Sequence, residues 1–346
     1  MIRLLVPLAA PLFFFVLTCH VAGQEPPGAD DASAREEALR TAIEAIERAE
    51  LQQKDDGLVA PTAAEEINRR LTSLQKLDPA GPLLPYLFGR AYALFGRVGD
   101  AIEQLRKFVE TRDGRNEWEA HRRLGDLFVE EFPTLAKASY GKALALKTDE
   151  PTALLGLSIC AYKSGDLDEA LRLAQQAVES DGRRTVRVVA HLARMFIANG
   201  QWAEADRSAV LALELAEAAV RKQPGRRGPL QTMEAQYDLL IDLGKARIKE
   251  KSTSAEDFVR FAGYIRNRSD VRARLALHDA LLVLERGVKA TSPSTLPRLL
   301  EQYAVTLAEV GRTEDAIAAF ERLLVLDPSN ATAAEWLGRL RSASKP

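Results

Sequence analysis

The sequence has little of what disulfide scaffolds, metal centres and strongly charged proteins require. Its 346 residues include 2 cysteines and 4 histidines, and the formal net charge is −2. So balanced a charge gives no strong positive field to hold a polyanion, which argues against a nucleic-acid binder. Aromatic residues make up only 6%, while Ala, Leu, Glu and Arg abound, a composition that favours helices over strands. We therefore expect an all-α protein with no nucleic-acid partner.

The motifs of metal and nucleotide chemistry are also missing. None of His121, His191 and His278 lies three or four residues from another His or Cys, and the chain has no HExxH, CxxC or GxxxxGK[ST] pattern. His121 and His191 fall on expected helices, where interhelix or surface roles are commoner than general-base roles. We predict no catalytic residue, no metal and no cofactor.

The first 23 residues form the one long apolar run. Arg3 is followed by apolar residues up to Leu17 and by a small-residue exit at Val21-Ala22-Gly23, as in a cleaved secretory signal peptide. A retained anchor and lipidation at Cys19 are the alternatives; the run is short for a spanning helix. We expect a secreted or periplasmic protein that contacts the membrane only through this segment. Cleavage would leave Cys160 as the one thiol, buried in an apolar helix.

A recurring pattern governs the rest of the chain: Gly, four residues, Ala, three residues, an apolar residue, two residues, and a second apolar residue. The anchor alanines follow one another at spacings of 35, 34 and 35 residues, and a later copy begins at Gly311. Twelve residues before each anchor stands a small residue, with one copy a residue out of step. These landmarks predict two antiparallel helices per unit, crossing at the small residues. The anchors and small residues are Ala101, Ala136, Ala170, Ala205, Ala316, and Gly89, Gly125, Ser158, Ala193, Ala304.

The units end where this scheme requires. Lys163-Ser164-Gly165-Asp166 supplies a glycine turn after a first helix, and Leu326-Asp327-Pro328 supplies a proline stop after a second helix. In these landmarks the chain resembles the tetratricopeptide repeat family, over about residues 82–215 and 297–330. The resemblance implies a right-handed superhelical solenoid of antiparallel helix pairs, because no pair buries its apolar face alone.

The expected organisation has six parts. They are a signal peptide (1–23), a flexible linker (24–33), an N-terminal helical pair (34–79), a repeat array (80–222), a divergent helical region (223–294), and a C-terminal repeat with a capping helix (295–346). In the divergent region we expect helices at 230–249, 255–266 and 271–289, after a loop at 225–228. Either two arrays of repeats joined by a degenerate middle or one continuous superhelix with an irregular turn would explain this divergent region.

In this register, the first helices line a concave groove. Arginine can grip carboxylates with two bonds, and tyrosine offers an apolar face with a polar tip, which suits a peptide or an amphipathic helix. The alternative is that each residue is solvated or packs at an edge. The clamp of chaperone-binding relatives includes an Asn that is missing here, which argues against that role. The candidate partner-binding residues are Tyr86, Arg90, Arg122, Asp126, Leu155, Ile159, Tyr162, Arg187 and Arg194.

We therefore expect a non-catalytic extracytoplasmic scaffold or adaptor for a protein or peptide partner. One alternative is an enzyme acting on an envelope polymer or carbohydrate, with its site in residues 225–296; clustered acids with raised pKa in a pocket there would favour it. The other is a homo-oligomer that acts as an assembly factor. A basic run from Arg260 to Arg274 is interpreted as a solvated helix face, offset by neighbouring acids.

Overall fold

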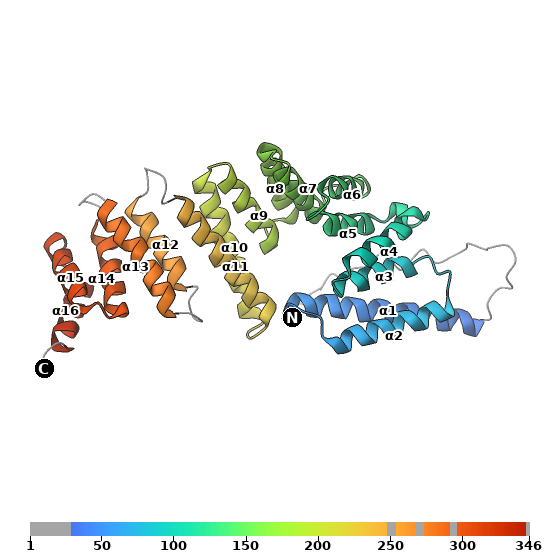
Figure 1. Cartoon of the computed structure of the whole chain (residues 1–346), viewed down its shortest axis with the longest axis horizontal. Helices are drawn as coiled ribbons and strands as arrows, with labels where there is room; N and C mark the ends of the chain where they lie inside the picture. Colours follow the sequence, from blue (N-terminus) through green and yellow to red (C-terminus); the bar gives the residue numbers. More distant parts are fainter. Residues whose placement is uncertain (1–28, 248–253, 268–272, 291–295, 344–346) are drawn as a thin grey trace, which may run out of the picture.

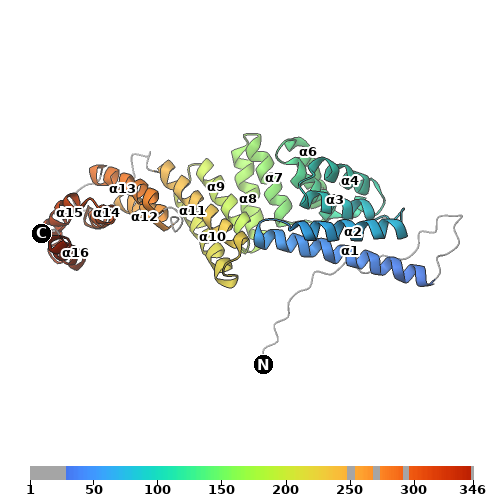
Figure 2. The same ribbon diagram turned by 60° about the horizontal axis from the view of Figure 1, so that its bottom comes forward.

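The structure is a computed structural model that describes residues 29–247, 254–267, 273–290 and 296–343, and in these ranges every regular element is a helix. Successive helices pack against one another along an elongated row (Figures 1 and 2). The predicted all-α solenoid of antiparallel helix pairs is confirmed. Its first five pairs are α1 (Ala29–Asp56) with α2 (Pro61–Leu77), α3 (Leu84–Leu94) with α4 (Val98–Glu110), α5 (Trp118–Phe128) with α6 (Pro133–Leu146), α7 (Pro151–Lys163) with α8 (Leu167–Asp181), and α9 (Val186–Ala198) with α10 (Trp202–Lys222).

The second half of the row continues this stacking without a break. Helix α11 packs between α10 and α12, and its Ile241 belongs to the same apolar core as Phe258 and Leu299. Of the two arrangements that the sequence left open, the structure has the continuous one. These later helices are α11 (Arg227–Arg247), α12 (Ala255–Asn267), α13 (Ala273–Ala290), α14 (Leu296–Val310), α15 (Thr313–Leu326) and α16 (Ala331–Ala343).

Glycine and proline set the helix ends as the repeat pattern predicts. Gly96, Gly165, Gly200 and Gly311 have φ of +71°, +82°, +69° and +85°, a left-handed conformation that a side chain would strain. At the other end, Pro133 stands in the first turn of α6, where its missing N–H has no helical partner to lose. These turns reverse the chain between paired helices.

The crossing points are tight because small residues occupy them. The anchor alanines are fully buried, and so is Ser158. A Cβ on Gly89 would lie 2.7 Å from Leu105 Cγ, and one on Gly125 would lie 2.6 Å from the Tyr140 ring. The small-residue positions therefore do what the sequence predicts: they let two helix backbones approach over a large neighbour.

The divergent middle uses the same device with different residues. A Cβ on Gly244 of α11 would lie 2.3 Å from Phe261 of α12, and one on Gly287 of α13 would lie 2.7 Å from Phe258. Here the neighbour of each glycine is a phenylalanine, whereas Gly89 and Gly125 face Leu105 and Tyr140. The repeat geometry thus continues where the sequence pattern fades.

Two boundaries differ from the expectation. Helix α1 already begins at Ala29, so residues 29–33 of the expected linker are helical. Asp31 and Ala32 suit a helix start, because an acidic side chain interacts favourably with the positive N-terminal end of the helix dipole and alanine has high helix propensity. Helix α11 begins at Arg227, inside the expected loop. The expected signal peptide lies outside the described residues, and no described helix is long and apolar enough to cross a membrane.

Candidate functional site

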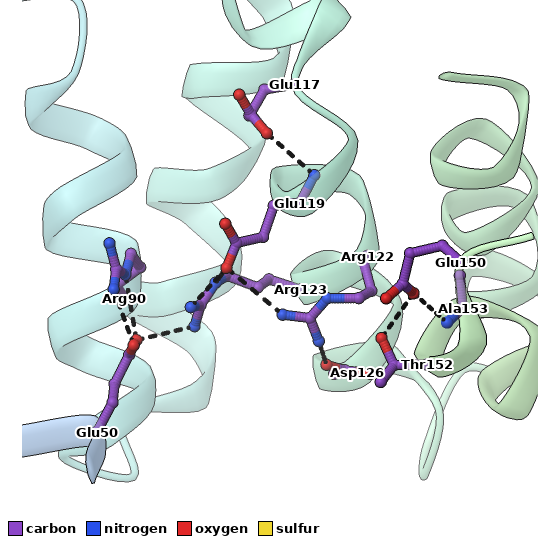
Figure 3. Close-up of polar contacts among 10 residues, drawn as sticks. All are labelled: Glu50, Arg90, Glu117, Glu119, Arg122, Arg123, Asp126, Glu150, Thr152 and Ala153. Carbon is purple, nitrogen blue, oxygen red and sulfur yellow. Dashed lines mark hydrogen bonds and ion pairs between the residues drawn. The ribbon is translucent and has the colours of Figure 1, made fainter. Parts of the chain in front are cut away.

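An ion-pair network joins the first helices of the first three units. Arg90 of α3 holds Glu50 of α1 with two hydrogen bonds, 3.1 Å from Nε and 2.8 Å from Nη2. Arg123 of α5 bridges the same Glu50 at 3.0 Å and Glu119 at 2.8 Å. Figure 3 shows these side chains converging from three different helices. Residues far apart in the chain are thus tied by charge-assisted bonds.

The network continues across α5 to α6. Arg122 pairs with Asp126, and the Tyr140 hydroxyl donates a hydrogen bond of 2.8 Å to the other oxygen of Asp126. Tyr140 is almost fully buried, and burial together with Asp126 raises its pKa. Its hydroxyl therefore stays protonated and donates to the carboxylate.

The charges in this network cancel. Burial alone would raise the pKa of Glu50 and of Glu119, but their arginine partners outweigh it and lower both pKa values. Three arginines face three carboxylates, so the arginines of α3 and α5 have no spare positive charge. The six residues are Glu50, Glu119, Asp126, Arg90, Arg122 and Arg123.

Three candidate residues are buried, so their side chains are poorly placed to contact a partner. Arg90 is only 6% exposed because it is held by Glu50, and Tyr86 is buried with its ring centroid 5.0 Å from that of Phe108. Leu155 lies in the apolar core. Arg122 and Asp126 are half-buried and are paired with each other.

The remaining four candidates lie on α7 and α9 and are accessible. Tyr162 is 47% exposed and Ile159 is half-buried. Arg187 and Arg194 are exposed, and neither forms an ion pair or hydrogen bond with another residue that the structure describes. They stand seven residues apart on α9, two helical turns or about 10 Å, and so share one face. We call Ile159, Tyr162, Arg187 and Arg194 the α7–α9 face.

A serine and a histidine meet beneath this face. The Ser158 hydroxyl lies 2.6 Å from the Ala170 carbonyl oxygen and 2.8 Å from His191 Nε2. The carbonyl can only accept, so Ser158 donates to it and His191 Nε2–H donates to Ser158. Burial lowers the pKa of His191 to about 4. A fully buried serine whose histidine donates to it has neither the access nor the base that a nucleophile needs.

The divergent middle holds a cluster of charges around Asp257. Arg260 bridges Asp206 at 2.6 Å and Asp257 at 2.8 Å, and Arg247 lies 3.1 Å from Asp257. Burial raises the pKa of Asp257, but hydrogen bonds from Ser254 and the arginines lower it overall. The cavity beside this cluster measures about 20 Å³, room for about one water molecule.

The acids with raised pKa that would favour an enzyme are therefore not found at this cluster. A larger cavity, about 220 Å³, lies at α1 and α2, outside the divergent middle, and is lined by three alanines together with Arg48, Gln52, Thr62 and Glu66. Within the basic run, Arg260 is neutralised and Arg266 pairs with Glu309 at 2.8 Å. Arg268 and Arg272, and the side chain of Arg274, lie outside what the structure describes.

Fold and site together define the class: an all-α solenoid whose α3 and α5 arginines are neutralised within the chain, with an accessible arginine and tyrosine face on α7 and α9 and no pocket of substrate size around Asp257. Two segments match models of the tetratricopeptide repeat, at residues 133–188 and 297–340. These matches and the fold support the resemblance that the repeat pattern indicates.

The comparisons with individual proteins agree with this class. A TPR repeat-containing protein of Dictyostelium discoideum is 32% identical over 139 residues, or 36% of this chain, and the chain spans about half the length of that relative (51%). The crystal structure of PilW, a type IV pilus biogenesis factor, aligns with a TM-score of 0.52 at 15% identity, covering 74% of this chain and 100% of PilW. MamA aligns with a TM-score of 0.40 at 24% identity, covering 46% of this chain and 92% of MamA. At 15% identity, the PilW alignment shows a shared fold alone.

Proposed function

We propose that this protein is an extracytoplasmic, non-catalytic scaffold that binds a protein or peptide partner through the α7–α9 face of its solenoid. The observation that carries the proposal is the contrast along the first helices. The arginines of α3 and α5 are neutralised within the chain, whereas Arg187 and Arg194 have no acidic partner among the described residues. The expected signal peptide supports the location.

The chemistry of this face suits a segment that carries both acidic and apolar side chains. Arg187 and Arg194 can each form charge-assisted hydrogen bonds to a carboxylate. Ile159 and Tyr162, on helix α7 that packs against α9, offer apolar contact area. Binding of this kind requires only that these side chains are exposed and requires no reacting group, which is consistent with the non-catalytic part of the proposal.

The test is recovery of the partner from the extracytoplasmic fraction by the tagged full chain. We expect the double variant Arg187→Glu, Arg194→Glu to bind the partner about tenfold more weakly or worse, because two attractive contacts become repulsive. The matched control is Arg322→Glu, an exposed arginine of α15 that likewise forms no ion pair with a described residue. Equal recovery by the double variant and the control would contradict the proposal.

The partner can also be a second copy of this chain. Sedimentation velocity on the purified protein distinguishes this case. A homo-oligomer that dissociates in the double variant but not in Arg322→Glu would identify the chain as its own partner. A monomer that still loses its partner in the pull-down would identify an adaptor.

A further inference from the structure

The first helix pair meets α11 although the two are far apart in the chain. The Arg226 guanidinium, in the turn before α11, lies 2.9 Å from the Asp56 carboxylate at the end of α1, 170 residues earlier. Figures 1 and 2 both show the C-terminal end of α1 against the turn between α10 and α11. Each helix from α1 to α11 also packs against the next. The contact therefore closes eleven helices into a ring.

Glycine makes this close approach possible. A Cβ on Gly228 would lie 2.1 Å from the carbonyl oxygen of Lys54 and 2.7 Å from that of Asp55, distances that no real side chain could adopt. On the other side, Gly57 ends α1 with φ of +77°, and a Cβ there would lie 2.6 Å from Gln231 Oε1. Gly228 thus lets backbone approach backbone at the junction, and Gly57 leaves room for the Gln231 side chain.

The electrostatics of the junction are complementary. The C-terminal end of α1 carries the partial negative charge of its last carbonyls, and the N-terminal end of α11 carries the partial positive charge of its first N–H groups. Asp56 and Arg226 pair across the same gap. The contact is thus attractive through both the helix dipoles and one ion pair.

The junction nevertheless differs from every other contact in the ring, because no apolar core crosses it. The buried residues of α1, such as Ile46, belong to the core shared with α2 to α7, whereas Leu240 and Leu243 of α11 belong to the core shared with α7 to α10. The ion pair that holds the junction is also partly solvated, with side-chain exposures of 54% and 31%. Such a pair is weak and is screened by salt.

We propose that the contact between the end of α1 and the start of α11, formed by Asp56, Arg226 and Gly228, is a latch. Its closed state fixes the ring. Its opening separates the first helix pair from α11 while every helix pair keeps its own core, and so changes the curvature of the array. This device does not depend on the identity of any partner.

The test is a distance measurement by pulsed electron–electron double resonance on the full chain. Spin labels are attached to Cys residues introduced at the exposed positions Leu58 and Gln223, and both native cysteines are replaced by Ala. We expect one short distance in the parent and a second, longer-distance population in Gly228→Ala and in Asp56→Lys. Alanine has higher helix propensity than glycine, so Gly228→Ala acts on the junction and not on the formation of α11. Sodium chloride at about 1 M, where the screening length is about 3 Å, should enlarge the longer population in the parent.

Three controls make the outcome decisive. Gly141→Ala, at a helical glycine where an added Cβ would meet no neighbouring atom within 4 Å, should leave the distance unchanged. The charge swap Asp56→Lys with Arg226→Asp should restore the short distance. A reference label pair at Glu103 and Lys137, on α4 and α6, should not move. Unchanged distances in Gly228→Ala, Asp56→Lys and high salt would overturn the proposal, as would an equal lengthening of the reference pair.

Discussion

At the scale of single residues, the buried polar groups connect neighbouring helices through hydrogen bonds and ion pairs. Glu50 occupies Arg90 and Arg123, and His191 donates its Nε2–H to Ser158. Removing one member of a buried pair leaves the other without compensation. For this reason Arg90 is a poor position for charge reversal, since loss of partner binding there would also follow from loss of the fold.

His191 predicts a dependence of stability on pH. Its pKa is about 4 in the folded chain and about 6.5 when unfolded. Between these values the unfolded chain takes up a proton that the folded chain does not, so the free energy of unfolding falls as the pH decreases from 6.5 to 4. From pH 7 to pH 5 we expect this residue to remove about 2 kcal/mol.

Urea unfolding at pH 7 and pH 5 measures this effect. His191→Gln keeps an N–H donor for Ser158 but does not titrate, so it should lose about 2 kcal/mol less than the parent over the same interval. An equal loss in His191→Gln and the parent would show that His191 is not the group responsible.

At the scale of the helix pair, glycine placement decides which residues can be enlarged. Gly125 and Gly141 lie on the paired helices α5 and α6, but only Gly125 faces a neighbour, the Tyr140 ring. We expect Gly125→Ala to destabilise the chain by about 1–2 kcal/mol, because overpacking outweighs the gain in helix propensity. Gly141→Ala should stabilise by up to about 1 kcal/mol. Thermal unfolding compares the two, and a stabilising Gly125→Ala would refute the tight crossing.

The sequence predicts these pairs well because the signals are local. Glycine turns, proline stops and anchor alanines all lie within one unit. The divergent middle was harder to predict, because its crossings, at Gly244 with Phe261 and at Gly287 with Phe258, are not marked by the anchor alanine of the pattern. The expected loop at 225–228 holds only for residues 225–226, since Gly228 serves close packing inside α11 and not a turn.

The candidate site was less predictable, because its side-chain contacts join residues that are far apart in the sequence. Ion pairs at a spacing of four residues, such as Glu119 with Arg123, can be read from one helix. The bond of Arg90 to Glu50 spans 40 residues and depends on how α1 stacks on α3. The register placed Arg90, Tyr86 and Leu155 on the right helices, but their burial follows from packing between units, which the repeat does not encode.

At the scale of the whole molecule, stacking gives a long, continuous surface. The ion pairs neutralise the arginines on one part of this surface and leave those on another part unpaired within the part of the chain that the structure describes. Helices α3 and α5 are neutralised from within, whereas α9 presents two free arginines among the described residues. The closure between Asp56 and Arg226 joins residues 170 positions apart, beyond the reach of any repeat spacing. Curvature and charge distribution thus arise from contacts between units.

The most direct test of the central claim is photo-crosslinking in the native compartment. A photoreactive amino acid replaces Tyr162, on the α7–α9 face, or Val325, which is 80% exposed on the second helix of the C-terminal pair. We predict a partner adduct at position 162 that disappears in the Arg187→Glu, Arg194→Glu background, and none at position 325. An adduct at 325 without one at 162 would contradict the account.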